Sequence, residues 1–128
     1  MDHRSEDRSP AQAVILLVDD EQLVRNFIGE LLTYEGYEVL SAVNGQQALE
    51  LSRSFAGSID LLLTDIVMPK MDGLELASCI RRERPAVKIL LMSGKSSGEI
   101  RIAGKQIEFL PKPFVAEALR AKLLAMLA

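Results

Sequence analysis

A continuous apolar run occupies residues 13–18 with the sequence AVILLV, and it ends in two aspartates, Asp19 and Asp20. An unbroken apolar run of this length is typical of a strand buried on both faces, as in a parallel sheet covered by helices. Residues 61–65, LLLTD, repeat the pattern and again end in an aspartate, Asp65. The two segments predict interior strands of a parallel sheet, each followed by acidic residues.

The rest of the chain predicts alternating helices and strands. Further strands are expected at residues 37–42, 88–93 and 107–110. Apolar residues recur at helical spacing over residues 21–35, and three more helices are expected after Asn44, after Asp72-Gly73 and after Phe114. Five strands alternating with helices indicate the α/β class, with a parallel sheet covered on both faces.

Composition narrows the class of protein. The chain has 128 residues, 48% of them hydrophobic, and a net charge of −3, which fits one compact domain. It lacks the basic stripe of a nucleic-acid-binding protein, since the basic residues of segment 81–88 are expected to be a solvated helix end. It also lacks a signal peptide pattern and an apolar run that could span a bilayer, so we expect a cytoplasmic protein without nucleic-acid or membrane partners.

Cysteine and histidine are too rare for several kinds of site. The single cysteine, Cys79, excludes an internal disulfide and a cysteine-based zinc site, and it is expected to be buried. The only histidine, His3, lies in residues 1–12, which are predicted to be a flexible N-terminal tail. Histidine chemistry is therefore not expected in the folded domain at residues 13–128.

Polar residues follow the predicted strands. They are Asp19, Asp20, Asp65, Ser93 and Lys112. Each alone has an ordinary explanation as a turn, helix cap or loop residue. Because the carboxyl ends of parallel strands share one edge of the sheet, all five are expected to converge there.

This set of residues favours phosphoryl transfer to a carboxylate. Three clustered aspartates repel one another unless a hard cation lies among them, and oxygen ligands select Mg²⁺. Asp65 can then attack phosphorus and form an acyl phosphate. Lys112 can place a positive charge on the phosphoryl oxygens, and the Ser93 hydroxyl can donate a hydrogen bond to them.

Five ordered segments resemble the signature motifs of bacterial response-regulator receiver domains. They are LVDDE at 17–21, TDIVMP at 64–69, MDG at 71–73, LMSG at 91–94 and LPKPF at 110–114. The resemblance covers residues 13–128 and implies a flavodoxin-like, doubly wound sheet of five parallel strands in the order 2-1-3-4-5. It also implies a signalling domain that takes a phosphoryl group from a histidine kinase or phosphotransfer protein and switches an unknown downstream protein.

The resemblance further implies roles for individual residues. Asp65 would be the phosphoacceptor of a domain that catalyses its own phosphorylation and dephosphorylation without being a turnover enzyme. Mg²⁺ would be bound by Asp20, Asp65 and the backbone carbonyl of Val67, with Asp19 acting mainly through water. Lys112 would be the phosphate-binding lysine, Ser93 the switch hydroxyl and Phe109 the switch aromatic. The peptide bond between Lys112 and Pro113 would be cis.

The chain departs from the family pattern at three places. Phe109 has no hydroxyl, so the switch would work by ring burial alone. Val115, which opens the last helix, cannot cap it. Between Ser93 and Ile107 only residues 98–103 are expected to form a short helix, so residues 94–106 are predicted to be the most mobile part of the domain.

Three other functions fit these residues less well. A haloacid-dehalogenase phosphatase needs a second acid two residues after the nucleophile, where this chain has Val67. A nucleotide-binding domain needs a glycine-rich loop where this chain has acidic residues. A phosphorylation-independent interaction module on the same fold is the alternative retained. A free-standing regulator is favoured over a receiver of a hybrid histidine kinase, although some motifs are similar to those of hybrid-kinase receivers.

Overall fold

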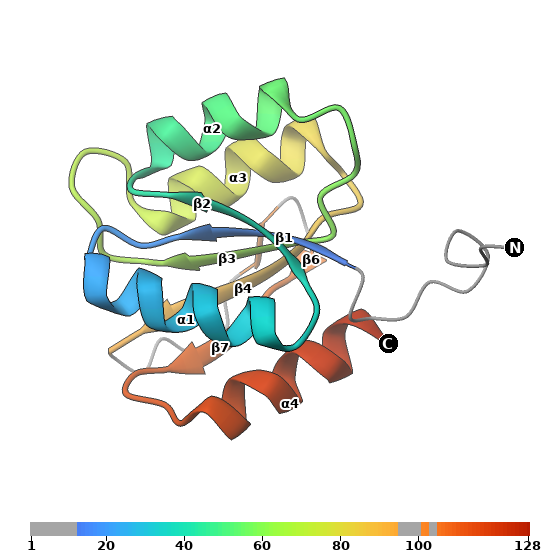
Figure 1. The fold of residues 1–128 in the computed structure, drawn as a ribbon. Coiled ribbons are helices and arrows are strands. Elements are labelled where there is room, and N and C mark those ends of the chain that lie inside the picture. Colours follow the sequence, from blue (N-terminus) through green and yellow to red (C-terminus); the bar gives the residue numbers. More distant parts are fainter. Residues whose placement is uncertain (1–12, 95–100, 103–104) are drawn as a thin grey trace, which may run out of the picture.

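A five-stranded parallel sheet forms the centre of the protein (Figure 1). The computed structural model describes residues 13–94, 101–102 and 105–128. The strands of this sheet are β1 Val14–Val18, β2 Glu38–Ala42, β3 Leu61–Asp65, β4 Lys88–Ser93 and β7 Glu108–Pro111, in the order β2-β1-β3-β4-β7. The predicted α/β fold and its strand order, 2-1-3-4-5 when these strands are counted along the chain, are confirmed.

Two helices cover each face of the sheet. Helices α2 (Gly45–Ser54) and α3 (Gly73–Glu83) lie on one face, and α1 (Gln22–Tyr34) and α4 (Ala116–Leu127) lie on the other (Figure 1). The strands supply both cores because their side chains alternate: Leu62 belongs to the α2–α3 core, whereas Leu61 and Leu63 belong to the α1–α4 core. This explains why an interior strand is apolar at every position.

The helix starts agree with the predicted caps. The Asn44 side chain accepts a hydrogen bond from the Gln47 amide at 2.8 Å, and Asp72 forms a capping box with Glu75. Val115 is the N-cap of α4 and provides no side-chain hydrogen bond, as predicted. None of the helices in the described part of the chain is long and apolar enough to cross a membrane.

The segment after β4 differs from the prediction. Arg101–Ile102 is a short strand, β5, that pairs antiparallel with β6, Lys105–Gln106. The helix predicted for residues 98–103 is therefore wrong at residues 101 and 102, because two of its residues form ladder hydrogen bonds instead. The other residues of this predicted helix lie outside the described ones. The same holds for most of residues 94–106, which were predicted to be mobile, and for the whole predicted tail at residues 1–12.

The basic segment 81–88 is not simply solvated. Arg81 is buried, and the guanidinium of Arg84 donates to the carbonyl oxygens of Ser52, Phe55 and Gly57 at 2.7–2.9 Å. Arg84 thus satisfies carbonyls at and beyond the end of α2, which a helix cannot satisfy internally. Cys79 is half-buried against the α2–α3 core, so the expectation that it would be buried was also wrong.

Candidate functional site

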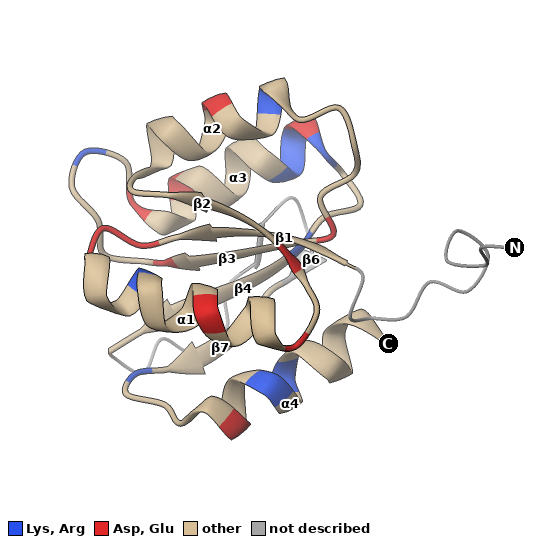
Figure 2. Cartoon of the chain, viewed as in Figure 1, with Lys and Arg blue, Asp and Glu red and all other residues tan. Residues whose placement is uncertain are grey.

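The candidate site lies where the parallel strands end. In the register of β1 and β3, Val18 is opposite Thr64, so Asp19 and Asp65 follow at neighbouring positions. In β4 and β7, Ser93 is opposite Pro111, which directly precedes Lys112. Figure 2 shows acidic residues at the ends of β1 and β3, along one edge of the sheet. The tertiary structure therefore brings the predicted strand-end residues to one place.

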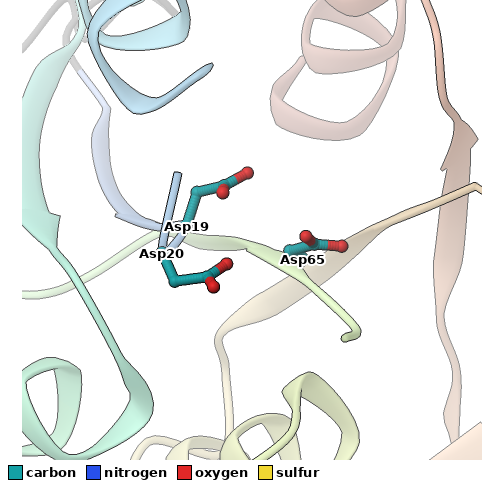
Figure 3. Close-up of side chains that lie close together, drawn as sticks. All are labelled: Asp19, Asp20 and Asp65. Carbon is teal, nitrogen blue, oxygen red and sulfur yellow. The ribbon is translucent and has the colours of Figure 1, made fainter. Parts of the chain in front are cut away.

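Three carboxylates converge at this edge (Figure 3). Asp19, Asp20 and Asp65 each offer one oxygen, and these oxygens all lie within 4.8 Å of one another. Asp19 is fully buried and Asp65 is 9% exposed, whereas Asp20 is exposed. The cluster consists of hard oxygen donors, which are the ligands that suit Mg²⁺. It opens to solvent on the Asp20 side.

Lys112 binds two of the three aspartates. Its Nζ atom lies 3.2 Å from Oδ2 of Asp65 and 3.4 Å from Oδ2 of Asp19. Burial alone lowers the pKa of Lys112, but the negative charges of Asp19 and Asp65 outweigh it and raise this pKa above its ordinary value. The two carboxylates therefore favour the charged form of Lys112 beside Asp65.

Asp19 is held in place by the residues that open α1. Its Oδ1 atom accepts a hydrogen bond from the Glu21 amide at 2.9 Å, and its backbone carbonyl oxygen accepts one from the guanidinium of Arg25 at 2.7 Å. Burial raises the pKa of Asp19, although the Glu21 amide and Lys112 oppose that shift. Asp19 is thus a desolvated carboxyl whose orientation is fixed by the first turn of α1.

The loop after Asp65 closes tightly onto the strand that carries it. The Gly73 amide donates to the carbonyl oxygen of Ile66 at 2.8 Å, and a Cβ atom on Gly73 would lie 2.2 Å from the carbonyl oxygen of Asp65. No other residue fits here without moving the backbone of Asp65. The sequence pattern placed Gly73 at a helix start and in the MDG motif at 71–73, but it did not predict this close approach to the backbone of Asp65.

The loop after β7 also has the expected geometry. The peptide bond between Lys112 and Pro113 is cis, as predicted, and the Lys112 amide donates to the carbonyl oxygen of Ser93 at 2.7 Å. Ser93 itself is buried at the end of β4. The backbone therefore ties the predicted hydroxyl and the predicted lysine to each other.

The remaining two residues of the predicted site, Phe109 and Val67, differ in how far their side chains are exposed. Phe109 is half-buried against the α2–α3 core, opposite Leu91 in the register of β4 and β7. The side chain of Val67, two residues after Asp65, is 77% exposed. The ring of Phe109 thus already contacts the core.

An apolar hollow lies beside the carboxylates, and the sequence pattern did not predict it. Leu23 and Phe27 of α1 are 84% and 51% exposed, and with Pro113 and Phe114 they line a hollow of about 540 Å³ that also reaches Lys112. Both residues occurred in the apolar spacing of residues 21–35, which contains more apolar positions than one buried helix face needs. That excess of apolar positions was the signal in the sequence that part of this helix exposes apolar side chains.

Comparisons with known proteins agree with the geometry. Residues 15–124 match the model of the family described as response regulator receiver domain. The response regulator MprA of Mycolicibacterium vanbaalenii is 36% identical over 116 residues, which cover 88% of this chain and 49% of that protein. The sensor kinase CckA of Brucella abortus is 36% identical over 118 residues, which cover 90% of this chain and 12% of that protein. The chain thus spans about half the length of MprA and a small part of CckA.

Solved structures lead to the same family. The response regulator TrrA of Thermotoga maritima, in complex with Mg²⁺ and BeF, superposes with a TM-score of 0.79 at 36% identity, covering 91% of this chain and all of that one. A second structure contains TrrA in complex with the histidine kinase ThkA, with a TM-score of 0.76 and 35% identity, again covering 91% and 100% of the two chains. These similarities extend across the strands that carry the carboxylates.

Proposed function

Because the chain belongs to the response-regulator receiver domain family of two-component systems, we propose that Asp65 accepts a phosphoryl group from a phosphohistidine of a histidine kinase or phosphotransfer protein. The main support is the convergence of three carboxylate oxygens within 4.8 Å, with the Lys112 ammonium 3.2 Å from Asp65. Structural modules without phosphorylation have no need to keep such a repulsive cluster. The phosphorylation-independent alternative is accordingly not favoured.

We assign the cation site to Asp19, Asp20, Asp65 and the backbone carbonyl of Val67. When bound there, Mg²⁺ supplies positive charge that neutralises the carboxylates and the incoming phosphoryl oxygens. The three carboxylates fit the ion in donor chemistry and spacing. Asp20, as the exposed member, leaves access for the ion and its remaining water ligands.

The transfer itself needs few groups from the protein. An oxygen of the Asp65 carboxylate forms the new bond to phosphorus, the bond between phosphorus and the donor imidazole breaks, and its electron pair stays on the imidazole nitrogen. Lys112, already beside Asp65, pairs with a phosphoryl oxygen, and Ser93 donates a hydrogen bond to another. Attack by water on the same phosphorus breaks its bond to the Asp65 oxygen, releases inorganic phosphate and restores the carboxylate, so the domain catalyses both steps on itself.

Ser93 and Phe109 are the proposed switch. The Lys112 amide is bonded to the carbonyl oxygen of Ser93, so movement of Ser93 toward a phosphoryl group also moves the loop after β7. Phe109 lies three residues before Lys112 and is half-buried, so it can enter the core more deeply without a partner for a hydroxyl. A downstream protein would recognise the surface changed in this way.

The apolar hollow beside Lys112 suits a donor protein. Leu23 and Phe27 expose apolar area next to the phosphoacceptor, and exposed apolar patches of this kind mark protein contact sites. TrrA, at 35% identity, forms a complex with a histidine kinase. We place the kinase or phosphotransfer protein on this surface, and we place the domain in the cytoplasm with that donor.

The test is phosphorylation with acetyl phosphate and Mg²⁺, followed by mass spectrometry. One base-labile phosphoryl group is expected on the wild-type protein and on Asp72→Asn, but none on Asp65→Asn. Asp72→Asn is the matched control because asparagine keeps the α3 cap at the same edge of the sheet. A phosphoryl group that persists on Asp65→Asn would contradict the assignment.

A further inference from the structure

Arg25 is a cation beside the carboxylate cluster that bonds the backbone and not a carboxylate. It lies near the start of α1 and is half-buried. Its Nη1 atom donates a short hydrogen bond, of 2.7 Å, to the backbone carbonyl oxygen of Asp19. Within the described residues Arg25 has no ion-pair partner, although three acids lie at the adjoining edge of the sheet. The phosphoryl transfer proposed for Asp65 gives Arg25 no part.

The start of α1 lacks the caps that fix the starts of α2 and α3. Asn44 and Asp72 cap those two helices with side-chain hydrogen bonds, whereas Glu21, the N-cap of α1, makes none. The first turn of α1 also contains no acidic residue. The hydrogen bond from Arg25 to Asp19 therefore takes over part of the work of a cap, because it joins the helix to the end of β1.

Three hydrogen bonds hold the backbone and side chain of Asp19 on the α1 side. The Asp19 amide donates to the carbonyl oxygen of Ala42 at 3.3 Å, and the Glu21 amide donates to Oδ1 of Asp19 at 2.9 Å. The third is the bond from Arg25 to the carbonyl oxygen of Asp19. This oxygen belongs to the peptide group that joins Asp19 to Asp20, so Arg25 fixes the plane of that peptide.

The direction of the Asp20 side chain depends on that peptide (Figure 3). Asp20 is exposed, and its carboxylate makes no hydrogen bond or ion pair with the described residues. Asp19 and Asp65, in contrast, are held by Lys112 at 3.4 and 3.2 Å. A functional group has to stay within about 0.5 Å of its productive position. For Asp20 the backbone alone provides that restraint.

We propose that Arg25 is a positioning residue for the cation site, because it holds the peptide between Asp19 and Asp20 and so directs the Asp20 carboxylate toward the ion. This inference rests on the proposed assignment of Asp20 as a Mg²⁺ ligand. Loss of a group that orients a metal ligand typically weakens metal binding 10–100-fold. Loss of a nearby positive charge alone has the opposite effect, since that charge repels Mg²⁺. The sign of the change in affinity therefore separates a positioning role from a simple charge effect.

The experiment is an NMR titration of the ¹⁵N-labelled protein with MgCl₂ at constant ionic strength, followed at the amides of Asp20 and Glu21. Arg25→Met, which removes the donor and the charge, should weaken Mg²⁺ binding about tenfold or more. Arg25→Lys keeps a charged donor and should recover most of the affinity. The rate of phosphorylation by acetyl phosphate should fall in Arg25→Met at low Mg²⁺ but return to the wild-type rate at saturating Mg²⁺, because Asp65 and Lys112 are intact.

Arg82→Met is the control, since it removes an exposed arginine at the end of α3, on the opposite edge of the sheet, and should bind Mg²⁺ as wild type does (Figure 1). Unchanged or tighter binding by Arg25→Met, or an equal loss in Arg82→Met, overturns the positioning role and leaves the proposed function intact. Unchanged binding by Asp20→Asn overturns the assignment of the ligand itself. If Arg25→Met does not fold in a urea titration, Arg25→Gln is judged by the same outcomes.

Discussion

Replacing Asp20 by asparagine should have opposite effects on stability with and without Mg²⁺. The three carboxylate oxygens lie within 4.8 Å of one another, and two unit charges at that limiting distance repel by about 0.9 kcal/mol in water and by about 3.5 kcal/mol at an effective dielectric constant of 20. Asp20 is exposed, so the water value applies to its pairs with Asp19 and Asp65, about 2 kcal/mol together, and salt and Lys112 offset part of it. Without metal, Asp20→Asn should therefore raise the free energy of unfolding by about 1 kcal/mol.

With Mg²⁺ the order of stabilities should reverse. A ligand at 100 times its dissociation constant stabilises the folded state by about 2.7 kcal/mol, and Asp20→Asn should lose most of that stabilisation together with a metal ligand. Urea titrations in EDTA and in saturating Mg²⁺ measure both effects. Glu30→Gln, an exposed acid on α1 with the same change in net charge, is the control and should show neither.

Two results would refute this reasoning. If Asp20→Asn is no more stable than Glu30→Gln in EDTA, the carboxylates do not repel one another in the folded protein. If Asp20→Asn keeps the full Mg²⁺ response, Asp20 does not bind the ion. Either result would remove the electrostatic argument for a cation among these aspartates.

The remaining predictions concern α4, an ion pair and the donor surface. Val115→Thr should stabilise the protein by about 0.5–2 kcal/mol in a urea titration, since Val115 is an N-cap without a side-chain hydrogen bond; an unchanged midpoint would contradict this. The hydrogen bond that Arg53 donates lowers the pKa of Glu83 in the folded protein. This pair therefore stabilises the fold at pH values above the pKa that Glu83 has in the unfolded chain. The stabilisation is lost as the pH falls through the lower pKa of the folded protein. Arg53→Gln should raise the pKa of Glu83 in a ¹³C carboxyl titration, and its stability deficit should vanish in acid; an unmoved pKa would exclude Arg53 as the cause. Phe27→Ala should slow phosphoryl transfer from a histidine kinase but not from acetyl phosphate, with Tyr34→Ala, another exposed aromatic of α1, as the control; equal slowing with both donors would argue against a donor contact at Phe27.

The sequence determined the sheet and the chemical character of its edge. Unbroken apolar runs such as residues 13–18 and 61–65 specify strands buried on both faces, and the residue that follows such a strand must lie at the carboxyl edge of a parallel sheet. The convergence of Asp19, Asp20 and Asp65 was therefore predictable from pattern alone. The N-caps at Asn44 and Asp72 were predictable for a similar reason, since caps depend on residues a few positions away.

Only the tertiary structure decided how distant segments meet. Lys112 contacts Asp19 across 93 positions of sequence, and no local pattern gives that distance of 3.4 Å or the shared contact with Asp65. Periodicity likewise identifies an apolar helix face but not what covers it, so Phe27 proved exposed and Arg81 buried, against the expectation of a solvated basic segment. Strand pairing of residues 101–102 with 105–106, where a short helix was predicted, has the same physical cause: short segments take the structure that their tertiary neighbours stabilise.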